Sequence, residues 1–326
     1  MAKVIPVASG KGGVGKSIIA LSLALSLSLK GKTVVLADFD LGGASQHLLL
    51  GMGIKGDEQG IGHLLHGHEK KLENLVTPTA YKRLHFIAGD AMLPGTHNIA
   101  QSFKERIIKE LRGLVADYVI IDLGAGSSYT VVDFFLASYS GIIVANPEIT
   151  SIMASYSFIK TTVFRALYRL YPPNAEEREI ILKFVKERIE GSELSFEHLM
   201  AKLKAKNSLA AEKVAAEINK LKPKLVFNMS RTAKDTEWAN KLSLIVKKKL
   251  GIQLELVAAL PYSERVRQSV SERVPIVSSY SSDVFVTALS PLIEKISLDK
   301  ERFNYEGALP LGGDDEKLLL KPSAYI

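Results

Sequence analysis

The sequence predicts a three-layer α/β fold, in which a mostly parallel sheet carries helices on both faces. Three observations support this class. Short β-rich apolar runs alternate with longer helical patterns in the first half of the 326-residue chain. Several runs, such as VVLA, YVIIDL and GIIVAN, are apolar throughout, as strands covered on both faces should be. A glycine-rich segment follows the first run directly and precedes a helical pattern.

Seven strands and a first helix are expected along the chain. The first strand, Lys3–Ala8, ends at the glycine-rich segment SGKGGVGKS. Residues 17–29 alternate leucine with serine, as a half-buried strand would, but their length and the preceding glycines predict a helix that ends at Gly31. The other strands are expected at Thr33–Ala37, Leu84–Ala88, Tyr118–Ile121, Gly141–Ala145, Lys224–Phe227 and Leu254–Leu260.

A long helical region separates the fifth and sixth of these strands. Residues 161–222 are rich in Lys, Glu, Ala and Leu, and YPPN and IEGSELSFEHL interrupt them, with Ser195 suited to cap a helix. We therefore expect a helical insertion at about 161–222 within a single domain of residues 1–296. Residues 297–326 include LPLGGDDE and are expected to form a loosely attached tail.

The composition excludes several classes of function. The chain has no cysteine, which rules out disulfides, thiolate metal sites and iron–sulfur clusters and fits a reducing compartment. The start MAKVIPVA does not read as a signal peptide, and no run reaches the roughly 18 apolar residues of a membrane span. We expect a cytoplasmic protein. The net charge of +7 leaves DNA or an anionic membrane surface open as partners without deciding between them.

The segment SGKGGVGKS carries the clearest functional signal. Its residues fill the pattern G-x-x-x-x-G-K-[ST] between a strand and a helix, where backbone N–H groups can enclose phosphate oxygens. Lys16 is expected to reach the β- and γ-phosphates, and the Ser17 hydroxyl to ligate Mg²⁺. The residues expected to line this phosphate loop are Gly10, Lys11, Gly12, Gly13, Val14, Gly15, Lys16, Ser17 and Ile18.

A second lysine, Lys11, stands at the front of the loop. KGGVGKS resembles the deviant phosphate loop of the family that includes the cell-division site selector MinD, ParA-type partition ATPases, FlhG/FleN-type flagellar regulators and the nitrogenase iron protein. In that family the early lysine crosses a dimer interface to the other subunit's nucleotide. The resemblance therefore implies an ATP-dependent homodimer in which Lys11 stabilises charge on the partner's phosphoryl group.

Two aspartate segments agree with this family. VVLADFDLGGAS ends a strand with Asp38 and Asp40, which period-two geometry places on one side of the chain at the carboxyl edge of the sheet. The resemblance implies that Asp40 orients or deprotonates the attacking water and that Asp38 supports the Mg²⁺ shell. The alternative for this pair is two aspartates that initiate a turn before GG.

The segment DYVIIDLGAGSS has the Walker B pattern, four apolar residues and then Asp122. A carboxylate at that position would hold Mg²⁺, usually through water. Gly124 and Gly126 match the family's switch segment, in which a backbone N–H senses the γ-phosphate. Asp117, before the strand, is interpreted as a surface residue.

An adenine site is expected from two segments further along the chain. VFNMSR resembles the strand end whose asparagine, here Asn228, hydrogen-bonds adenine, and an amide both donates and accepts as adenine requires. LPYSERVRQS resembles the loop that packs against the base through Pro261 and Tyr262, with Glu264 nearby. The alternative for Asn228 is a buried asparagine that closes a strand.

The particular function is narrowed by residues that are missing. Without cysteine the chain is neither a nitrogenase iron protein nor an Mrp-type cluster carrier, and the single tyrosine of PSAYI does not match the tyrosine cluster of bacterial kinases of this fold. MinD and the FlhG/FleN regulators end in an amphipathic membrane helix, whereas this tail is acidic and broken by proline and glycine. Membrane contact is therefore expected to be peripheral at most.

The leading hypothesis is a cytoplasmic ATPase that dimerises around ATP and Mg²⁺, turns over slowly, and positions or regulates a structure such as the division site or the flagellum. A protein partner is expected at the 161–222 helices. The alternative is a ParA-type ATPase that coats DNA non-specifically through patches such as VKKKLG, Val246–Gly251, for which a solvated helix face is the plainer interpretation. A further alternative is an amidoligase or synthetase on the same fold.

Overall fold

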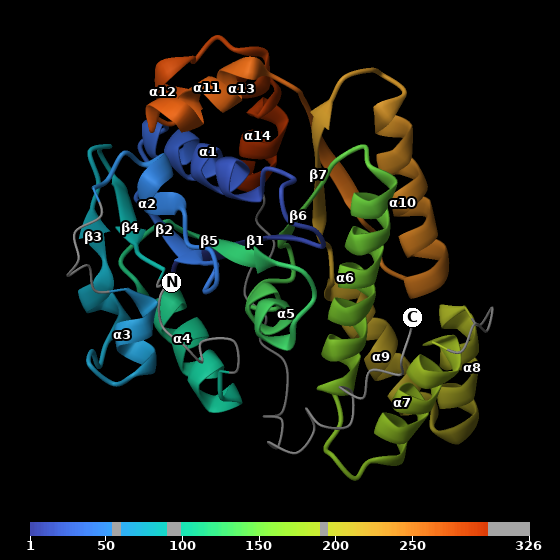
Figure 1. The fold of residues 1–326 in the computed structure, drawn as a ribbon. Helices are drawn as coiled ribbons and strands as arrows, with labels where there is room; N and C mark the ends of the chain where they lie inside the picture. Colours follow the sequence, from blue (N-terminus) through green and yellow to red (C-terminus); the bar gives the residue numbers. More distant parts are fainter. Residues whose placement is uncertain (54–59, 90–98, 190–194, 299–326) are drawn as a thin grey trace.

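The chain folds around one sheet, which the computed structural model describes for residues 1–53, 60–89, 99–189 and 195–298 (Figure 1). The strand order is β3-β4-β2-β5-β1-β6-β7-β8, and every neighbouring pair is parallel except β3 and β4. The strands are β1 Lys3–Ser9, β2 Val34–Phe39, β3 Thr77–Pro78, β4 Leu84–Ile87, β5 Tyr118–Ala125, β6 Ile142–Ala145, β7 Lys224–Ser230 and β8 Glu255–Pro261. The predicted fold class and all seven predicted strands are confirmed.

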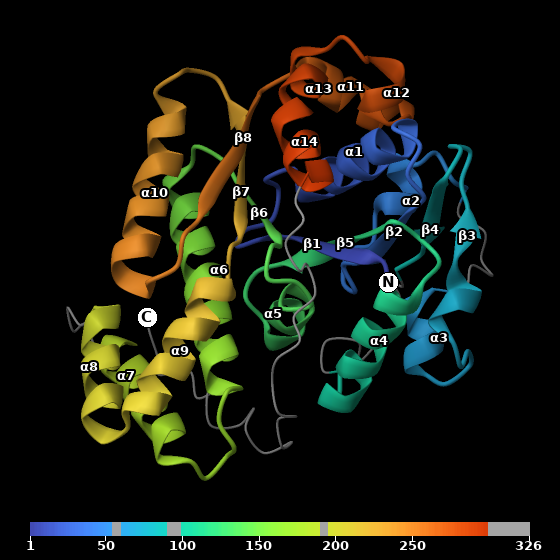
Figure 2. The same cartoon turned by 180° about the vertical axis from the view of Figure 1, so that it is seen from behind.

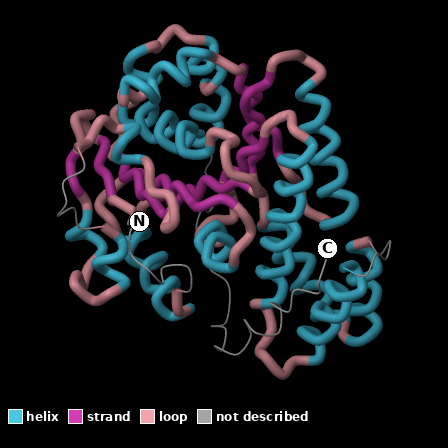
Figure 3. The backbone as a smooth tube through the Cα atoms, in the orientation of Figure 1, coloured by secondary structure: helices cyan, strands magenta, loops and turns pink. Residues whose placement is uncertain are grey.

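Helices cover both faces of this sheet, as Figures 1 and 2 show. On one face lie α1 Lys16–Leu29, α2 Gln46–Leu49, α11 Glu264–Glu272, α12 Ile276–Ser279, α13 Val284–Ala288 and α14 Ser290–Leu298. On the other face lie α3 Ile61–Leu65, the 3₁₀ turn Leu72–Leu75, α4 Gln101–Gly113, α5 Tyr129–Phe135, α6 Ile149–Tyr168 and α10 Asp235–Leu250. Three further helices pack against α6 and α10, namely α7 Glu176–Ile189, α8 Phe196–Lys206 and α9 Ser208–Lys220. The colouring by element in Figure 3 shows the same layers.

The strands are apolar throughout because the sheet is buried on both faces. In β1, Val4 and Ala8 pack into the core on one face, whereas Ile5 and Val7 pack into the core on the other. This alternation is the period-two geometry of a strand, applied to two cores. The short strand β3 was not predicted, because two residues that include a proline carry no strand pattern of their own.

The leucine–serine run is a helix, as predicted. Leu21, Leu23, Leu25 and Leu27 are buried in the core, whereas Leu29 at the end of the helix is exposed. The serines Ser22, Ser26 and Ser28 are also buried. The Ser28 hydroxyl donates to the carbonyl of Leu25 at 2.8 Å, so a serine in this helix meets its hydrogen-bonding need within the helix.

The predicted helical insertion begins later than expected. Helix α6 runs unbroken through residue 161, and its buried side chains belong to the core beneath the sheet. Composition shows no break there because α6 is helical on both sides of that point. The added helices α7–α9 follow the YPPN break and return the chain to β7. The predicted tail, apart from the last two residues of α14, lies outside the described residues.

Within the described ranges, no helix combines the length and the apolar character that a membrane crossing requires.

Candidate nucleotide-binding site

The phosphate loop joins β1 to α1 at the carboxyl edge of the sheet. Gly13 and Gly15 have φ of +78° and +87°, the left-handed region in which glycine carries no steric cost. Helix α1 begins directly after Gly15, and no side chain caps its first N–H groups. An uncapped helix N-terminus presents N–H donors and partial positive charge, the chemistry that binds phosphate.

The start of the loop is pressed against α6. A Cβ built on Gly10 would lie 2.2 Å from the backbone carbonyl of Ala154, so only glycine fits this approach. Backbone contact at this distance cannot be relieved by a side-chain rotation. The first residue of the loop is therefore seated directly on the helix that follows β6.

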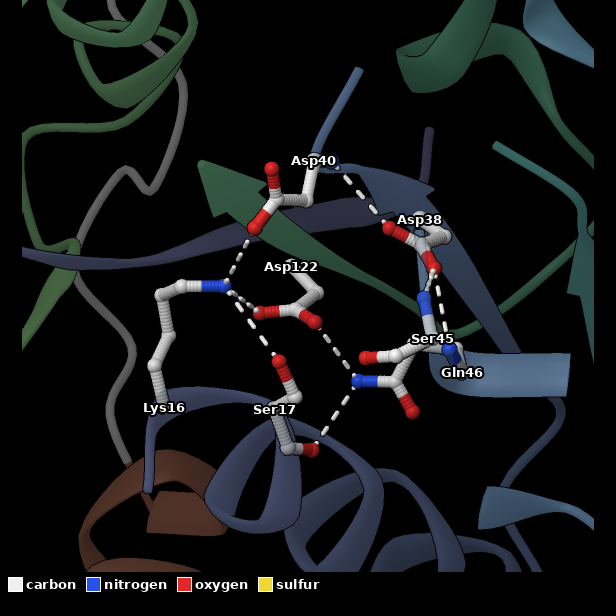
Figure 4. Close-up of polar contacts among 7 residues, drawn as sticks. All are labelled: Lys16, Ser17, Asp38, Asp40, Ser45, Gln46 and Asp122. Atoms are coloured by element: carbon white, nitrogen blue, oxygen red, sulfur yellow. Dashed lines mark hydrogen bonds and ion pairs between the residues drawn. The ribbon is translucent and has the colours of Figure 1, made fainter. Parts of the chain in front are cut away.

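Lys16 lies at the centre of the charged groups, with its side chain only 7% exposed. Its Nζ is 2.6 Å from Asp122 Oδ1 and 3.8 Å from Asp40 Oδ2, and it donates to the Ser17 hydroxyl at 3.4 Å (Figure 4). The loop lysine, the loop serine and the Walker B aspartate thus come together as predicted. Two carboxylates converge on one ammonium group.

Asp38 and Asp40 share the carboxyl edge, but their carboxylates face different groups. Strand β2 ends at Phe39, so strict alternation stops before Asp40. The Asp38 carboxylate is fully buried and accepts backbone N–H bonds from Asp40, Ser45 and Gln46, at 3.1, 3.0 and 3.0 Å. Asp40, whose side chain is 30% exposed, turns toward Lys16 instead (Figure 4).

Burial sets the protonation of Asp38. Desolvation, followed by the nearby charge of Asp122, raises the pKa of Asp38 from 3.8 to about 7, against the lowering effect of its backbone hydrogen bonds and of Lys16. Burial is the larger cause of this rise and the Asp122 carboxylate is the second, so two buried acidic groups lie close together beside Lys16. Such a site favours the arrival of another cation.

Gln46 belongs to this cluster although the sequence did not single it out. Its Nε2 donates to Asp122 Oδ2 at 2.8 Å and to the Ser17 carbonyl at 2.9 Å, and the residue is fully buried. It lies 76 positions from Asp122 in the chain. Gln46 stands in the segment SQHLLL, and no spacing rule connects it with a Walker B aspartate.

The switch segment after β5 is tied to the loop. Gly126, with φ of +91°, donates its backbone N–H to the Ser9 carbonyl at 2.9 Å. Gly124 lies beside the water-orienting candidate, since a Cβ there would be 3.3 Å from Asp40 Oδ1. The predicted γ-phosphate contact of Gly126 would have to replace its bond to Ser9.

Lys11 is held at the surface by residues that the sequence did not indicate. Its Nζ donates to Glu148 Oε2 at 2.7 Å and to the Thr150 hydroxyl at 2.9 Å, with the Lys11 and Glu148 side chains 42% and 55% exposed. The hydrogen bond from Lys11 lowers the pKa of Glu148 below its usual value, helped by Asn146. The exposed apolar side chains Ile149 and Met153 lie on the same first turns of α6.

The predicted adenine residues lie at the ends of β7 and β8. Asn228 is buried, and its Nδ2 donates to the carbonyl of Val14 in the phosphate loop at 2.8 Å. In β8, Pro261 is the last strand residue, and the Tyr262 hydroxyl donates to Glu264 Oε1 at 2.6 Å. The Arg231 guanidinium stacks on the Tyr262 ring at 4.3 Å. The Asn228 amide thus holds the phosphate loop against β7 through this hydrogen bond.

The donor set fits Mg²⁺ bound together with phosphates. Ser17, Asp122 and Asp38 offer oxygen atoms, the ligands that Mg²⁺ prefers, and Lys16 supplies the cation that phosphates need. Among the described residues no group of three or more acidic or histidine side chains is arranged to hold a metal by itself. Since Mg²⁺ usually takes one or two carboxylates plus substrate oxygens, this sparse set suits a nucleotide-dependent site.

The basic patch VKKKLG closes α10. Lys247 and Lys248 are exposed, Lys249 is half-buried, and Val246 and Leu250 are buried in the core. This is the arrangement of a solvated helix end with lysines near the negative pole of the helix.

Comparisons with known proteins agree with this geometry. A family model described as "ParA: NUBPL iron-transfer P-loop NTPase" matches residues 1–162, although the chain has no cysteine for an iron–sulfur cluster. The flagellum site-determining protein YlxH of Helicobacter pylori is 30% identical over 223 residues, covering 64% of this chain and 66% of YlxH. The septum site-determining protein MinD of the same organism is 32% identical over 158 residues, 48% of this chain and 57% of MinD. The matched stretches thus span less than two thirds of these two relatives.

Two further similarities settle the family and the fold. The antiactivator FleN of Pseudomonas aeruginosa is 31% identical over 197 residues, covering 56% of this chain and 67% of FleN. The structure of MinD with Mg-ADP from Pyrococcus horikoshii superposes with a TM-score of 0.61 at 19% identity, over 91% of this chain and 97% of that one. With its deviant phosphate loop, Walker B aspartate and these relatives, the chain belongs to the MinD/ParA-like family of P-loop NTPases.

Proposed function

We propose that this chain is a cytoplasmic, Mg²⁺-dependent ATPase that dimerises around ATP, hydrolyses it slowly, and positions or regulates a cellular structure. The observation that carries this proposal is the convergence of Lys16, Asp122 and Asp40 at an uncapped helix N-terminus. The relatives named for flagellum and septum placement support the cellular role.

The groups of the site divide the work of phosphoryl transfer. Lys16 and the N–H groups of the loop bind the β- and γ-phosphates and stabilise their charge. Bound Mg²⁺, held by Ser17 and, through water, by Asp122 and Asp38, would neutralise developing charge on the phosphate oxygens. Asp40 is the carboxylate that reaches solvent, so it is placed to orient a water molecule and take its proton. The water oxygen then bonds to the γ-phosphorus as the bond to the bridging oxygen breaks, giving ADP and phosphate.

The dimer would form on the face that carries Lys11. Lys11 lies at the surface beside the exposed Ile149 and Met153, whose side chains are 66% and 63% exposed. Exposed apolar side chains beside Lys11 are what a surface needs if a second copy of the chain is to cover it. A protein partner would bind the added helices α7–α9, which contribute none of the site residues named above.

The test is ATP binding and turnover with purified protein. We expect Mg²⁺-dependent ATP binding, which Lys16→Ala abolishes because the phosphates lose their buried cation. Lys30→Ala, an exposed lysine just after the same helix, is the matched control and should bind as the wild type does. Absence of Mg²⁺-dependent ATP binding by the wild type would refute the proposal.

The dimer is tested by light scattering after size-exclusion chromatography. Asp40→Ala should bind ATP, fail to hydrolyse it and remain dimeric, because the water is no longer activated. Lys11→Ala should bind ATP as a monomer. A monomeric Asp40→Ala variant with bound ATP would contradict the proposed switch.

A second candidate function is ParA-type DNA binding, favoured by the exposed Lys247 and Lys248 on α10. The ParA-family ATPase of Chlorobium tepidum has the same fold, with a TM-score of 0.60 at 15% identity. Retention of DNA should then require ATP, fall steeply with salt, and weaken in a Lys247→Glu, Lys248→Glu double variant. Retention that is independent of ATP or insensitive to salt would exclude this function.

A further inference from the structure

Gln46 joins three parts of the site through one buried residue. Its backbone N–H donates to Asp38 Oδ2 at 3.0 Å, and its Nε2 donates to both the Ser17 carbonyl and Asp122 Oδ2, at 2.9 and 2.8 Å (Figure 4). The residue is fully buried. Strand β2, helix α1 and strand β5 therefore meet at this residue.

The orientation of the Gln46 amide follows from its neighbours. Both groups that face Nε2 are oxygen acceptors, a carboxylate and a carbonyl. A reversed amide would place Oε1 against these two oxygens, which is repulsive. The two N–H bonds of Nε2 are therefore directed at Ser17 and Asp122.

The other end of the amide makes Gln46 costly to bury. Its Oε1 is buried and has no hydrogen-bond partner among the residues that the structure describes. An unpartnered buried acceptor costs on the order of 1–3 kcal/mol, which an apolar side chain of the same length would avoid. This cost offsets part of what the two hydrogen bonds of Nε2 contribute, so those two donors are what the residue supplies to the site.

The Asp122 carboxylate is consequently held by different partners at its two oxygens. Oδ2 accepts from Gln46, and Oδ1 is 2.6 Å from Lys16 Nζ and faces the phosphate loop. Phosphates that bind Lys16 would compete with Oδ1 for that ammonium group, whereas the bond from Gln46 to Oδ2 does not involve Lys16. Asp122 then keeps its orientation with Oδ1 available.

We infer that Gln46 is a positioning residue of the Mg²⁺ site, which fixes Asp122 so that Oδ1 is the oxygen presented to the metal and its waters. This inference rests on the proposed ATPase function. It specifies which carboxylate oxygen serves the metal and which residue, outside the phosphate loop and Walker B motifs, determines that choice. Partners of this kind, one shell outside the ligands, typically affect metal affinity 10- to 100-fold.

The experiment measures the affinity of the full-length chain for a fluorescent ATP analogue, with Mg²⁺ and with EDTA. The ratio of the two dissociation constants isolates the metal's contribution. Gln46→Met keeps the length of the side chain and removes both donors together with the unpartnered Oε1. We expect its Mg²⁺ enhancement to fall about 10- to 100-fold, while the affinity in EDTA stays within about twofold.

If Gln46 served mainly to stabilise the fold, Gln46→Met would lower the melting temperature strongly, which we do not expect. Loss of two hydrogen bonds is partly offset by removal of the unpartnered oxygen, so the melting temperature of Gln46→Met should change by only a few degrees. Gln46→Glu is the second variant, because it keeps the shape and places an acceptor against Asp122. Its Mg²⁺ enhancement should fall at least as far. His47→Ala, the next residue of α2, is the control and should retain the wild-type ratio.

The outcomes separate this inference from the proposed function. Wild-type protein without any Mg²⁺ enhancement overturns both. Wild-type enhancement that Gln46→Met and Gln46→Glu leave unchanged overturns the role of Gln46 alone. Equal losses with Mg²⁺ and with EDTA also overturn it, because they show a general disturbance of the phosphate loop.

Discussion

Two clusters of buried charge in this molecule are built in opposite ways. At the carboxyl edge of the sheet, Asp122 and Asp40 share one lysine, Lys16, and the buried Asp38 lies close enough to feel the charge of Asp122. Below the sheet, between α4, α5 and α6, the Asp133 carboxylate lies close to three cations. Asp133 is 2.6 Å from Lys104, 2.8 Å from Arg165 and 3.6 Å from Arg169.

The carboxyl groups titrate accordingly. Burial raises the pKa of Asp38 to about 7, and the charge of Asp122 adds to the rise. Burial also acts to raise the pKa of Asp133, but the Arg165 hydrogen bond and the charges of Arg169, Arg165 and Lys104 hold it below its usual value. The first cluster gains from a further cation and the second does not. This difference separates a site that receives a ligand from one that fastens helices together.

The largest expected effect comes from breaking the second cluster. Asp133→Asn leaves Lys104, Arg165 and Arg169 buried without their carboxylate, so the free energy of unfolding should fall by about 3–5 kcal/mol. Urea unfolding measures this loss. Asp117→Asn, at an exposed carboxylate that accepts one N–H from Thr33, is the control and should lose far less. A loss below about 1 kcal/mol for Asp133→Asn would show that the cluster does not hold the helices together.

A smaller, pH-dependent effect is expected at Asp38. Its pKa is about 7 in the folded protein against an ordinary 3.8, so the folded state binds this proton more tightly than the unfolded state. The stabilisation is complete below pH 4 and is lost as the pH rises toward 7. Relative to Asp38→Asn, which mimics the protonated group, the wild type should therefore lose a few kcal/mol of stability between about pH 4 and 7. A difference that does not vary with pH would contradict the raised pKa.

The smallest effect is expected where an ion pair is exposed. The pair of Lys11 with Glu148 lies at the surface, so solvent screens it and Glu148→Gln should leave the melting temperature unchanged within error. A drop of several degrees would mean that Lys11 is structurally fixed, which is unexpected for a lysine that acts on a partner's nucleotide.

The parts of the site that were predicted from sequence are those held by local geometry. A loop between a strand and a helix places Lys16 and Ser17, and four apolar residues before Asp122 place it at the end of β5. The partners that were missed come from distant segments. Glu148 lies 137 positions from Lys11, and Gln46 lies 76 from Asp122. Only the packing of the sheet and its helices brings such pairs together.

The same distinction explains the fold. Strands apolar on both faces could be recognised one at a time, whereas the two-residue strand β3 exists only because β4 pairs with it. The expected start of the helical insertion falls inside α6, which packs on the sheet and also contacts the added helices. The composition of α6 does not change along its length, so it carries no mark of where packing on the sheet gives way to contact with the added helices.

The contact of Gly10 with α6 links the phosphate loop to the helices that follow α6. Helix α6 is 20 residues long, which corresponds to about 30 Å, and its far end packs against α7 and α9. Its near end touches the backbone of the phosphate loop with no side chain between them to absorb movement. Helix α6 thus connects the added helices directly to the phosphate loop, so it is the element through which a partner at α7–α9, as proposed above, would act on the loop.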